Sequence, residues 1–307
     1  MFTYPLMVLG TILGMFIRVN GKPQLCMLVS IAGCILNVVL DYMFVARMEL
    51  GVKGSAIGSL LVQLVTVLAQ LMFFFLPDTI VRFRRFVFDR EVGKEMILNG
   101  SSEFIGEMAS AISMFAFNYV LMKYVGADGV AAFTILGFVV YGYSMVCIGF
   151  GQGISPIVSI CWGAKEKETA IKIRSITNRI LLAIGTLTAL SFFVAGKRYA
   201  EIFGCSNSIA DMVATGFRIY AITFLVMGYD VTGSMYFTSC GDAKSSAIIS
   251  SLRGIVLLLA FILIFPAIFG MNGVWMASPF AETLTSIVTF VLIRRQVRKN
   301  KEEENAR

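Results

Sequence analysis

Carboxylate and amide side chains at helical spacing inside apolar stretches are the residues of this sequence best placed to do chemistry. Asn37 and Asp41 lie four residues apart, so a helix would carry both on one face. A carboxylate oxygen and an amide oxygen on a shared face suit Na⁺ or a proton, because hard cations prefer oxygen ligands. We interpret the pair as a cation site, against the alternative that Asp41 caps its helix or pairs with Arg47.

Glu103 and Glu107 form a second pair with the same spacing. Glu107 lies well inside its apolar stretch, where a carboxylate is costly if that stretch crosses a membrane. Two acids at this distance repel each other in a low-dielectric cavity, which favours proton exchange near neutral pH. We expect the pair to line a substrate cavity or to carry protons; the alternative is that both side chains point into an open cytoplasmic funnel.

Three further polar residues interrupt apolar stretches: Glu282, Asp230 and Gln63. Asp230 lies in the segment MGYDVTGS, whose glycines predict close approach or bending of helices. Ionisable residues inside a membrane are candidate functional sites, so we assign these three to the same substrate-cavity or proton-coupling group. Arg253 lies near the start of its stretch, and we expect its side chain to extend to the cytoplasmic face instead.

The elements that hold these residues are expected to be transmembrane helices. Hydrophobic residues make up 57% of the 307 residues and charged residues only 15%, which no water-soluble domain of this size could bury. Only helices or closed barrels pair all backbone amides in lipid, and the alternating pattern of barrel strands is absent. Apolar stretches of roughly 17–25 residues therefore predict an all-α polytopic membrane protein with about nine helices, at about 1–18, 25–46, 54–77, 96–122, 130–155, 172–195, 210–238, 244–269 and 272–293.

The net charge of +7 follows the expected topology and does not indicate a nucleic-acid partner. If the tail RRQVRKNKEEENAR is cytoplasmic, the tail and the loops on that side hold most of the 26 Lys and Arg residues. This bias predicts a multi-pass protein of the cell membrane with a cytoplasmic C-terminus. The six cysteines are scattered and there is no histidine, so the sequence predicts no cofactor, no disulfide framework and no metal beyond Na⁺ at Asp41 and Asn37.

An internal repeat relates the first three helices to the last three. The segment GVKGSAIGS (51–59) matches GMNGVWMAS (270–278), and NGK (20–22) occupies the place of CGD (240–242). Chance similarity between glycine-containing turns is the alternative, but the order of the matches is kept over three helices. Gln63 and Glu282 then become equivalent, and we expect them to line a cavity around a pseudo-twofold axis.

The second copy of the repeat follows three additional helices, whose partners would precede Met1. We therefore expect about 110–130 further residues and a complete protein of twelve helices in two bundles of six, acting as a monomer. The predicted domains are residues 1–80, the last three helices of the first bundle; 81–95, a cytoplasmic linker; 96–295, the second bundle; and 296–307, a cytoplasmic tail.

Four segments carry a resemblance to a known family: ILNVVLDYMF (35–44), GVKGSAIG (51–58), NGSSEF (99–104) and GFGQGISPIVSICWGAKE (149–166). With them the whole chain resembles the multidrug and toxic compound extrusion (MATE) family. The resemblance implies that Asn37 and Asp41, with the hydroxyl of Ser59 on the next helix, belong to a cation site. The family also uses an acid on its first helix, which this chain does not contain, so the implied site is incomplete.

The resemblance and the acidic residues together predict a secondary antiporter, in which Na⁺ or H⁺ flows in while an organic, often cationic, small molecule is exported. A flippase of lipid-linked saccharides in the same superfamily is the first alternative, although it would need basic residues deep in the cavity. A non-functional transporter fragment is the second. We expect no enzyme, because the sequence has no HExxH, GxSxG or DDxxD motif. The expected partners are the small-molecule substrate and the lipid bilayer.

Overall fold

The computed structural model describes residues 3–76, 79–81 and 89–305, and within these ranges every regular element is a helix. The predicted all-α polytopic architecture is confirmed. Eight helical spans are long and apolar enough to cross a membrane, and α1, with 17 residues, is a shorter apolar helix. The elements are α1 (Thr3–Val19), α2 (Pro23–Asp41), η1 (Tyr42–Arg47), α3 (Gly51–Phe73), α4 (Arg90–Tyr124), α5 (Ala127–Gly163), α6 (Lys167–Ile202), α7 (Asn207–Ser239), α8 (Ala243–Ser251), η2 (Leu252–Val256), α9 (Leu257–Phe269) and α10 (Met271–Asn305), where η1 and η2 are π-helical.

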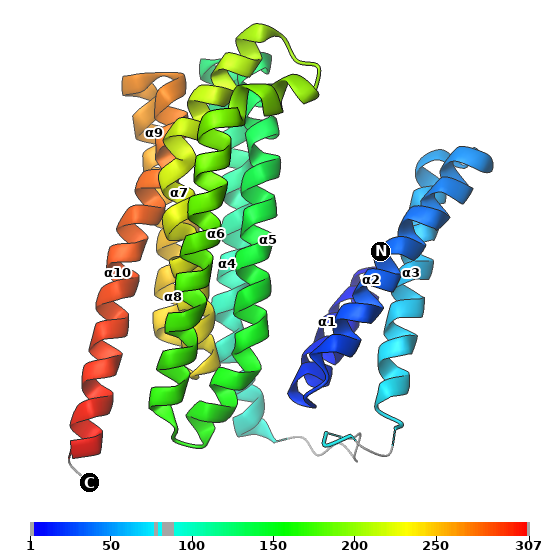
Figure 1. Ribbon diagram of the computed structural model, residues 1–307, viewed down its shortest axis with the longest axis vertical. Helices are drawn as coiled ribbons and strands as arrows, with labels where there is room; N and C mark the ends of the chain where they lie inside the picture. The colour runs from blue at the N-terminus through cyan, green and yellow to red at the C-terminus, as the bar shows by residue number, and fades with distance from the viewer. Residues whose placement is uncertain (1–2, 77–78, 82–88, 306–307) are drawn as a thin grey trace. The chain divides into compact units, whose positions relative to one another are not determined.

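The helices fall into two compact units that separate after Phe88. Helices α1–α3 form the first unit and α4–α10 the second, as the colours of Figure 1 show. Residues 82–88 of the predicted linker lie outside the described residues, and α10 continues as a helix to Asn305, through most of the predicted tail. The functions assigned above to these domains remain predictions.

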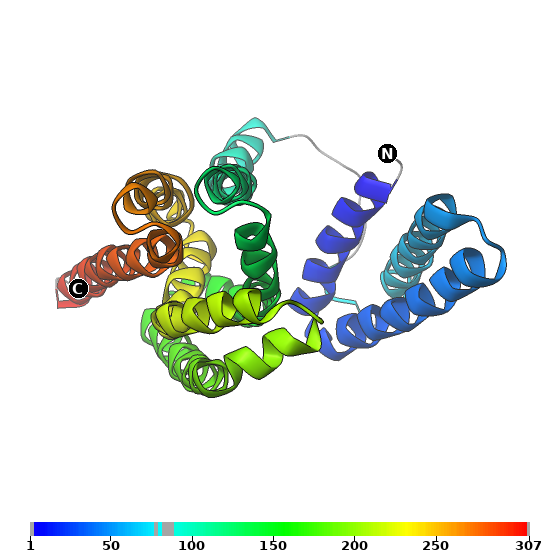
Figure 2. The ribbon, with the colours of Figure 1, turned by 90° about the horizontal axis from the view of Figure 1, so that it is seen from above.

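The second unit is built around α7, which packs against α5, α6, α8 and α10. Figure 2 views these helices nearly end-on. Lipid tails are as apolar as leucine, so helices in a membrane associate mainly through close packing at small residues. Gly185 on α6 makes such a contact, because a Cβ atom there would lie only 2.1 Å from the carbonyl oxygen of Phe224 on α7. The fully buried Trp275 of α10 stacks near Phe133 of α5, which ties α10 to the same core.

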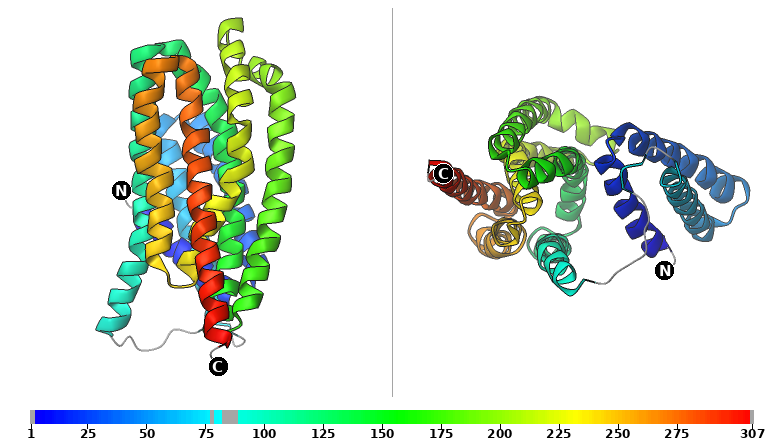
Figure 3. Two further views of the ribbon diagram at one scale, coloured as in Figure 1. Left: turned by 90° about the vertical axis from the view of Figure 1, so that its left-hand side faces the viewer. Right: turned by 90° about the horizontal axis from the view of Figure 1, so that it is seen from below.

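Helices α8 and α9 form one membrane span, Ala243–Phe269, with η2 between them. The chain turns at Gly270 and α10 returns beside α9, as Figure 3 shows. A π-helical turn widens a helix locally and is frequent at functional sites. Here η2 carries Arg253, the one basic residue of this turn.

The turns of the two units repeat, as the sequence predicts. Gly21 and Gly241 have φ angles of +75° and +78°, and Gly51 and Gly270 have +54° and +57°. Residues with a side chain rarely adopt these angles, so glycine is required at each turn. The equivalent pairs thus share a backbone conformation as well as a sequence.

A close backbone approach also repeats at the second of these turns. A Cβ atom at Gly54 would lie 2.9 Å from the carbonyl oxygen of Phe44, and one at Gly273 would lie 2.2 Å from the carbonyl oxygen of Phe265. In each unit the glycine lets the last helix of the repeat start directly against the end of the preceding helix. Chance similarity of the turns does not account for this shared geometry.

Candidate functional site

Asp230 of α7 is completely buried and accepts two hydrogen bonds from α10. Ser286 donates to its Oδ2 at 2.7 Å, and Thr289 donates to its Oδ1 at 2.8 Å. The helices can come this close because a Cβ atom at Gly233 would lie 2.6 Å from Thr289 Cγ2. The close approach predicted from MGYDVTGS is confirmed. Both carboxylate oxygens of Asp230 are therefore held by hydroxyl groups, and none of the salt bridges among the described residues includes Asp230.

Glu282 of α10 forms an ion pair with Arg253 of η2. The Nε atom of Arg253 donates to Oε1 of Glu282 at 2.7 Å, and the two side chains are 26% and 6% exposed. The expectation that Arg253 extends to the cytoplasmic face is wrong, because the carboxylate on the neighbouring helix holds the guanidinium inside the unit. The second oxygen of Glu282, Oε2, is buried and has no hydrogen-bond partner.

These three charged residues form one electrostatic group. Arg253 interacts with Asp230 as well as with Glu282, and the two carboxylates also interact with each other. Glu282 lies roughly 16 Å along α10 from its first residue, and Asp230 lies roughly 14 Å before the end of α7, at 1.5 Å per residue. With both acids ionised the group carries one net negative charge, and each acid lies about a third of the way in from one end of its helix.

The group can accept a monovalent cation or a proton, but its composition does not match a resident metal centre. Among the described residues, no set of three or more His, Cys, Asp or Glu side chains is arranged to hold a metal ion. Glu282 Oε2 is the one carboxylate oxygen of the group without a hydrogen bond. An incoming cation would therefore be stabilised most by binding at this atom.

Glu103 and Glu107 lie apart from this group, on an exposed face of α4. Glu103 accepts a hydrogen bond of 3.1 Å from Thr238 near the end of α7. Thr238 also belongs to a chain of hydrogen-bonded hydroxyl groups that was not predicted from the sequence. Its hydroxyl oxygen lies 2.8 Å from that of Ser246, which lies 2.9 Å from that of Ser234. Ser250 joins Ser234 at 3.0 Å.

In the first unit, Asp41 occupies a tight position between α2 and α3. Its Oδ1 atom is buried without a hydrogen-bond partner and lies 3.0 Å from where a Cβ atom of Gly58 would be. Asn37 and Ser59 are partly exposed. None of the hydrogen bonds among the described residues joins two members of this predicted set, so the structure places them on neighbouring helices without showing a formed site.

Gln63 of α3 faces α1. Its side-chain oxygen lies 4.0 Å from the Cβ position of Gly10, and that of Gln70 lies 3.6 Å from the same point. In the repeat, Gly10 is the counterpart of Asp230, and Gln63 and Gln70 are the counterparts of Glu282 and Thr289. The buried carboxylate is therefore present in the second copy only, and its hydrogen-bond donor Thr289 replaces a glutamine whose Oε1 has no partner.

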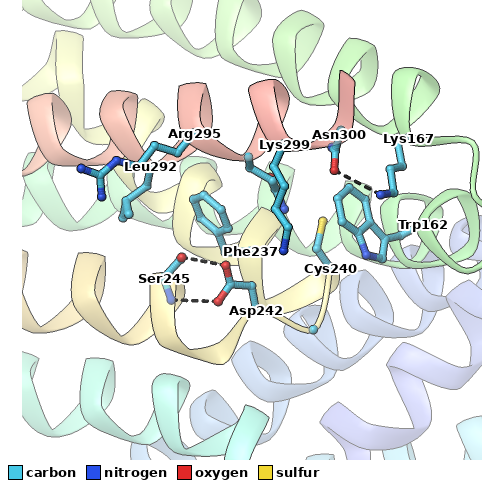
Figure 4. A pocket seen from close by; sticks show the side chains of 12 residues that line it. Trp162, Lys167, Phe237, Cys240, Asp242, Ser245, Leu292, Arg295, Lys299 and Asn300 are labelled. Atoms are coloured by element: carbon cyan, nitrogen blue, oxygen red, sulfur yellow. Dashed lines mark hydrogen bonds between the residues drawn. The ribbon is translucent and has the colours of Figure 1, made fainter. Parts of the chain in front are cut away.

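Two cavities open at the end of the second unit where α10 ends, and neither is lined by a predicted site residue, although the CGD turn (240–242) of the repeat lines the first. The first, of about 580 Å³, lies between α5, α7, α8 and α10 (Figure 4). Around it Lys167 donates to Asn300 at 3.2 Å, and Asp242 accepts two hydrogen bonds from Ser245. The second cavity, of about 800 Å³, lies between α6, α7 and α10 and includes Arg174. The one sequence feature that pointed to these two cavities was the run of basic residues in the segment RRQVRKNKEEENAR.

The chain was compared with models of known protein families. Residues 104–265, which extend from α4 into α9, match the model of the MatE family. This segment covers more than half of the chain and contains Asp230 and Arg253.

Curated relatives are distant in sequence. The multidrug export protein MepA of Staphylococcus aureus is 21% identical over 296 residues, which cover 94% of this chain and 64% of the relative. MepA of Staphylococcus saprophyticus has the same identity over 293 residues, with the same coverage. The chain thus spans about 64% of the length of these relatives.

Solved structures share the fold. A crystal structure of MATE in complex with MaL6 superposes with a TM-score of 0.88 at 24% identity, covering 97% of this chain and 68% of that one. An outward-facing multidrug resistance MATE family transporter of the MOP superfamily gives 0.83 at 24% identity, covering 93% and 65%. A MOP superfamily transporter from Pyrococcus furiosus, described by the reverse polarity of its binding pocket, gives 0.82 at 24% identity, covering 92% and 64%.

Proposed function

The chain belongs to the MatE family, and from this membership we propose that it exports small organic molecules, often cationic, in exchange for inward flow of Na⁺ or H⁺. It is a multi-pass membrane protein, and transport requires a solute path through its helices. The observation that carries the proposal is the buried group of Asp230, Arg253 and Glu282. Charged residues at this depth are costly in a membrane, and they are typical of ion or substrate pathways.

In the proposed mechanism, Arg253 and the coupling ion alternate as partners of Glu282. When no ion is bound, the guanidinium compensates the Glu282 carboxylate at 2.7 Å. A proton or Na⁺ that reaches the free Oε2 atom weakens this pair, because the carboxylate charge is then shared. Arg253 can then turn toward Asp230, with which it already interacts. The ion is released when the pair forms again, and alternating access links these two states to outward transport of the substrate.

Asp41 is proposed as a second coupling position, with Asn37 and Ser59 as neighbours. Its buried Oδ1 atom lacks a donor, and a bound cation would supply the missing interaction. Na⁺ would need the further oxygens of Asn37 and Ser59, whereas a proton would need Asp41 alone. This difference provides a way to identify the ion.

A flippase of lipid-linked saccharides is the alternative function. It would use uncompensated positive charge in the membrane to hold an anionic substrate. Arg253 is the basic residue of the buried group, and its charge is already balanced by Glu282. When both acids are ionised, the net negative charge of the group favours organic cations as substrates.

The proposal is tested by efflux of a fluorescent organic cation from bacterial cells that lack their main multidrug exporters and produce this chain. We expect efflux above that of cells without the chain, driven by a Na⁺ or a pH gradient. Asp230→Asn should lower the rate at least about tenfold, because a buried hydrogen-bonded charge is worth about 1.5–3 kcal/mol. The matched control is Asp211→Asn, which changes an exposed acid on the same helix and should leave the rate unchanged.

The two outcomes have separate meanings. If the chain reaches the membrane but gives no efflux, the proposed export activity of this chain is wrong. If efflux occurs and Asp230→Asn and Asp211→Asn behave alike, the activity stands and the buried group is not its coupling site. Measuring each variant with only one gradient imposed at a time identifies the ion.

A further inference from the structure

The cavity between α6, α7 and α10 combines positive charge with an apolar wall. Four arginines line it, Arg174 from α6 and Arg294, Arg295 and Arg298 from α10. Its single acidic residue, Glu302, is already paired with Arg298 at 2.9 Å. In the part of the chain that the structure describes, the cavity therefore has three arginines without a carboxylate partner, and it is complementary to an anion.

Arg174 is the residue that makes this cavity a built site. Only 7% of it is exposed, and its Nε and Nη1 atoms are buried without hydrogen-bond partners. Its guanidinium carbon lies 5.8 Å from the ring centre of Tyr229 and 5.4 Å from that of Tyr236, so two aromatic faces stabilise its charge. Such contacts replace only part of the lost hydration, and the free N–H groups remain available for an anionic oxygen.

Arg294 supplies a second cationic group near Tyr229. Its guanidinium carbon stacks 4.3 Å from the ring centre of Phe290, and its charge reaches Tyr229, as does that of Arg174. Guanidinium groups bind phosphate oxygens with two parallel hydrogen bonds, and a stacked guanidinium keeps its edge free for this contact.

The rest of the cavity wall is apolar and faces outward from the unit. Phe290 and Val291 are 44% and 41% exposed and precede the arginines on α10. Along this helix an apolar surface thus passes directly into a basic one. A ligand that fits both must carry an anionic group and long hydrocarbon chains.

We propose that this cavity binds an anionic phospholipid, with its phosphate on Arg174 and Arg294 and its acyl chains along Phe290 and Val291. The position agrees with the charge bias of the sequence, which assigns this end of α10 to the cytoplasmic face. Basic pockets between transmembrane helices at that face bind the head groups of anionic lipids. The bound lipid would hold the ends of α6, α7 and α10 together, independently of transport.

The test is native mass spectrometry of the purified chain in detergent, with phosphatidylglycerol and phosphatidylcholine of identical acyl chains. We expect retention of phosphatidylglycerol at least about fivefold above that of phosphatidylcholine. Arg174→Gln and Arg294→Gln should each lower phosphatidylglycerol binding by about the same factor. Arg179→Gln, which changes an exposed arginine on α6 outside the cavity, should not.

A third arm adds inorganic phosphate in excess. Displacement of the lipid only at high millimolar phosphate supports a lipid site, whereas displacement at micromolar phosphate would identify a site for free phosphate and overturn the proposal. Equal retention of the two lipids would also overturn it. Arg294 is exposed, so Arg294→Gln is expected to fold even if Arg174→Gln does not, and unchanged phosphatidylglycerol binding in Arg294→Gln alone would be sufficient to reject the site.

Discussion

Arg253 donates a 2.7 Å hydrogen bond to Glu282, and the two residues come from adjacent helices that meet inside the membrane-spanning unit. A pair of this kind contributes little net stability, because the cost of removing both charges from water offsets their attraction. Removing only one partner is different, since it leaves a buried charge without compensation. The pair therefore has a clear signature in mutants.

We predict that Arg253→Gln destabilises the protein by about 3 kcal/mol, and that Glu282→Gln does so by less, because Arg253 can then turn toward Asp230. The double variant Arg253→Met with Glu282→Met should recover part of that stability, because neither member of the pair is then left without its partner, and Asp230 keeps its hydrogen bonds from Ser286 and Thr289. Export should be lost in all three. The measurement is the midpoint of thermal unfolding in detergent, followed by size-exclusion fluorescence.

The control for this prediction is Glu302→Gln. Glu302 pairs with Arg298 one turn away on α10, and both side chains are largely exposed. Exposed pairs of this type contribute at most about 0.5 kcal/mol. Equal losses for Glu282→Gln and Glu302→Gln would show that the deeper pair is hydrated and carries no special role.

A second prediction concerns Asp41 and its contact with Gly58. Asp41→Asn should raise the Na⁺ or H⁺ concentration needed for half-maximal export by at least about tenfold, in line with the loss of a charged interaction. Gly58→Ala should shift it in the same direction but less, because its Cβ atom would lie 3.0 Å from Asp41 Oδ1 and displace the carboxylate. Ion titrations of the export rate provide the measurement.

Glu49→Gln is the matched control, since Glu49 is an exposed acid that follows the same helix. If Asp41→Asn and Glu49→Gln give the same ion dependence, Asp41 is not a coupling residue. Retention of Na⁺ dependence in Asn37→Ala would separately exclude Asn37 as a ligand.

The helices were predictable because each has a long apolar stretch bounded by glycine or charged turns. The repeat was predictable because its turns require glycine: Gly51 and Gly270 both adopt positive φ angles, so both turns keep this residue in the sequence. Helix ends were less accurate: α10 continues to Asn305 because charged residues such as Lys299 can extend a helix beyond the apolar stretch.

The candidate site was only partly predictable. Asp230 and Glu282 were identified as acids inside apolar stretches, but sequence spacing relates residues on one helix and gives no information on contacts between helices. The pairing of Arg253 with Glu282 was missed for this reason, as were the hydroxyl donors Ser286 and Thr289. The start of α6 was predicted at about residue 172, whereas α6 starts at Lys167, because the charged residues before the apolar stretch continue the helix.

The third prediction uses the glycines at the repeated turns. Gly273→Ala places a Cβ atom 2.2 Å from the Phe265 carbonyl oxygen and should cost about 1–3 kcal/mol through overpacking. Gly54→Ala meets Phe44 at 2.9 Å and should cost less. Gly137→Ala, which meets nothing within 4 Å on α5, should be neutral or stabilising by up to about 1 kcal/mol.

Thermal unfolding of the three variants, compared with the unchanged chain, decides this point. The expected order of stability is Gly137→Ala first, Gly54→Ala second and Gly273→Ala last. If Gly273→Ala were as stable as Gly137→Ala, the backbones at this turn would be further apart than the structure shows.

The last prediction concerns Cys240, in the turn between α7 and α8 and outside both membrane spans. Burial raises the pKa of the Cys240 thiol to about 12, although hydrogen bonds with Tyr236 and Gln296 act in the opposite direction. The thiolate is the reactive form, so at pH 8 only about one part in ten thousand of the thiol is reactive. Labelling by maleimide should therefore be slow and rise about tenfold for each pH unit between 7 and 11.

Peptide mass spectrometry of the labelled turn measures this rate. The control is Lys244→Cys in a Cys240→Ser background, which places a thiol at an exposed position of α8. With an ordinary pKa of about 8.5, this thiol should react quickly at pH 8 and reach a plateau above about pH 9. If Cys240 reacted as fast as the control at pH 8, the thiol would be open to water, and the packing of the turn against Tyr236 and Gln296 would be wrong.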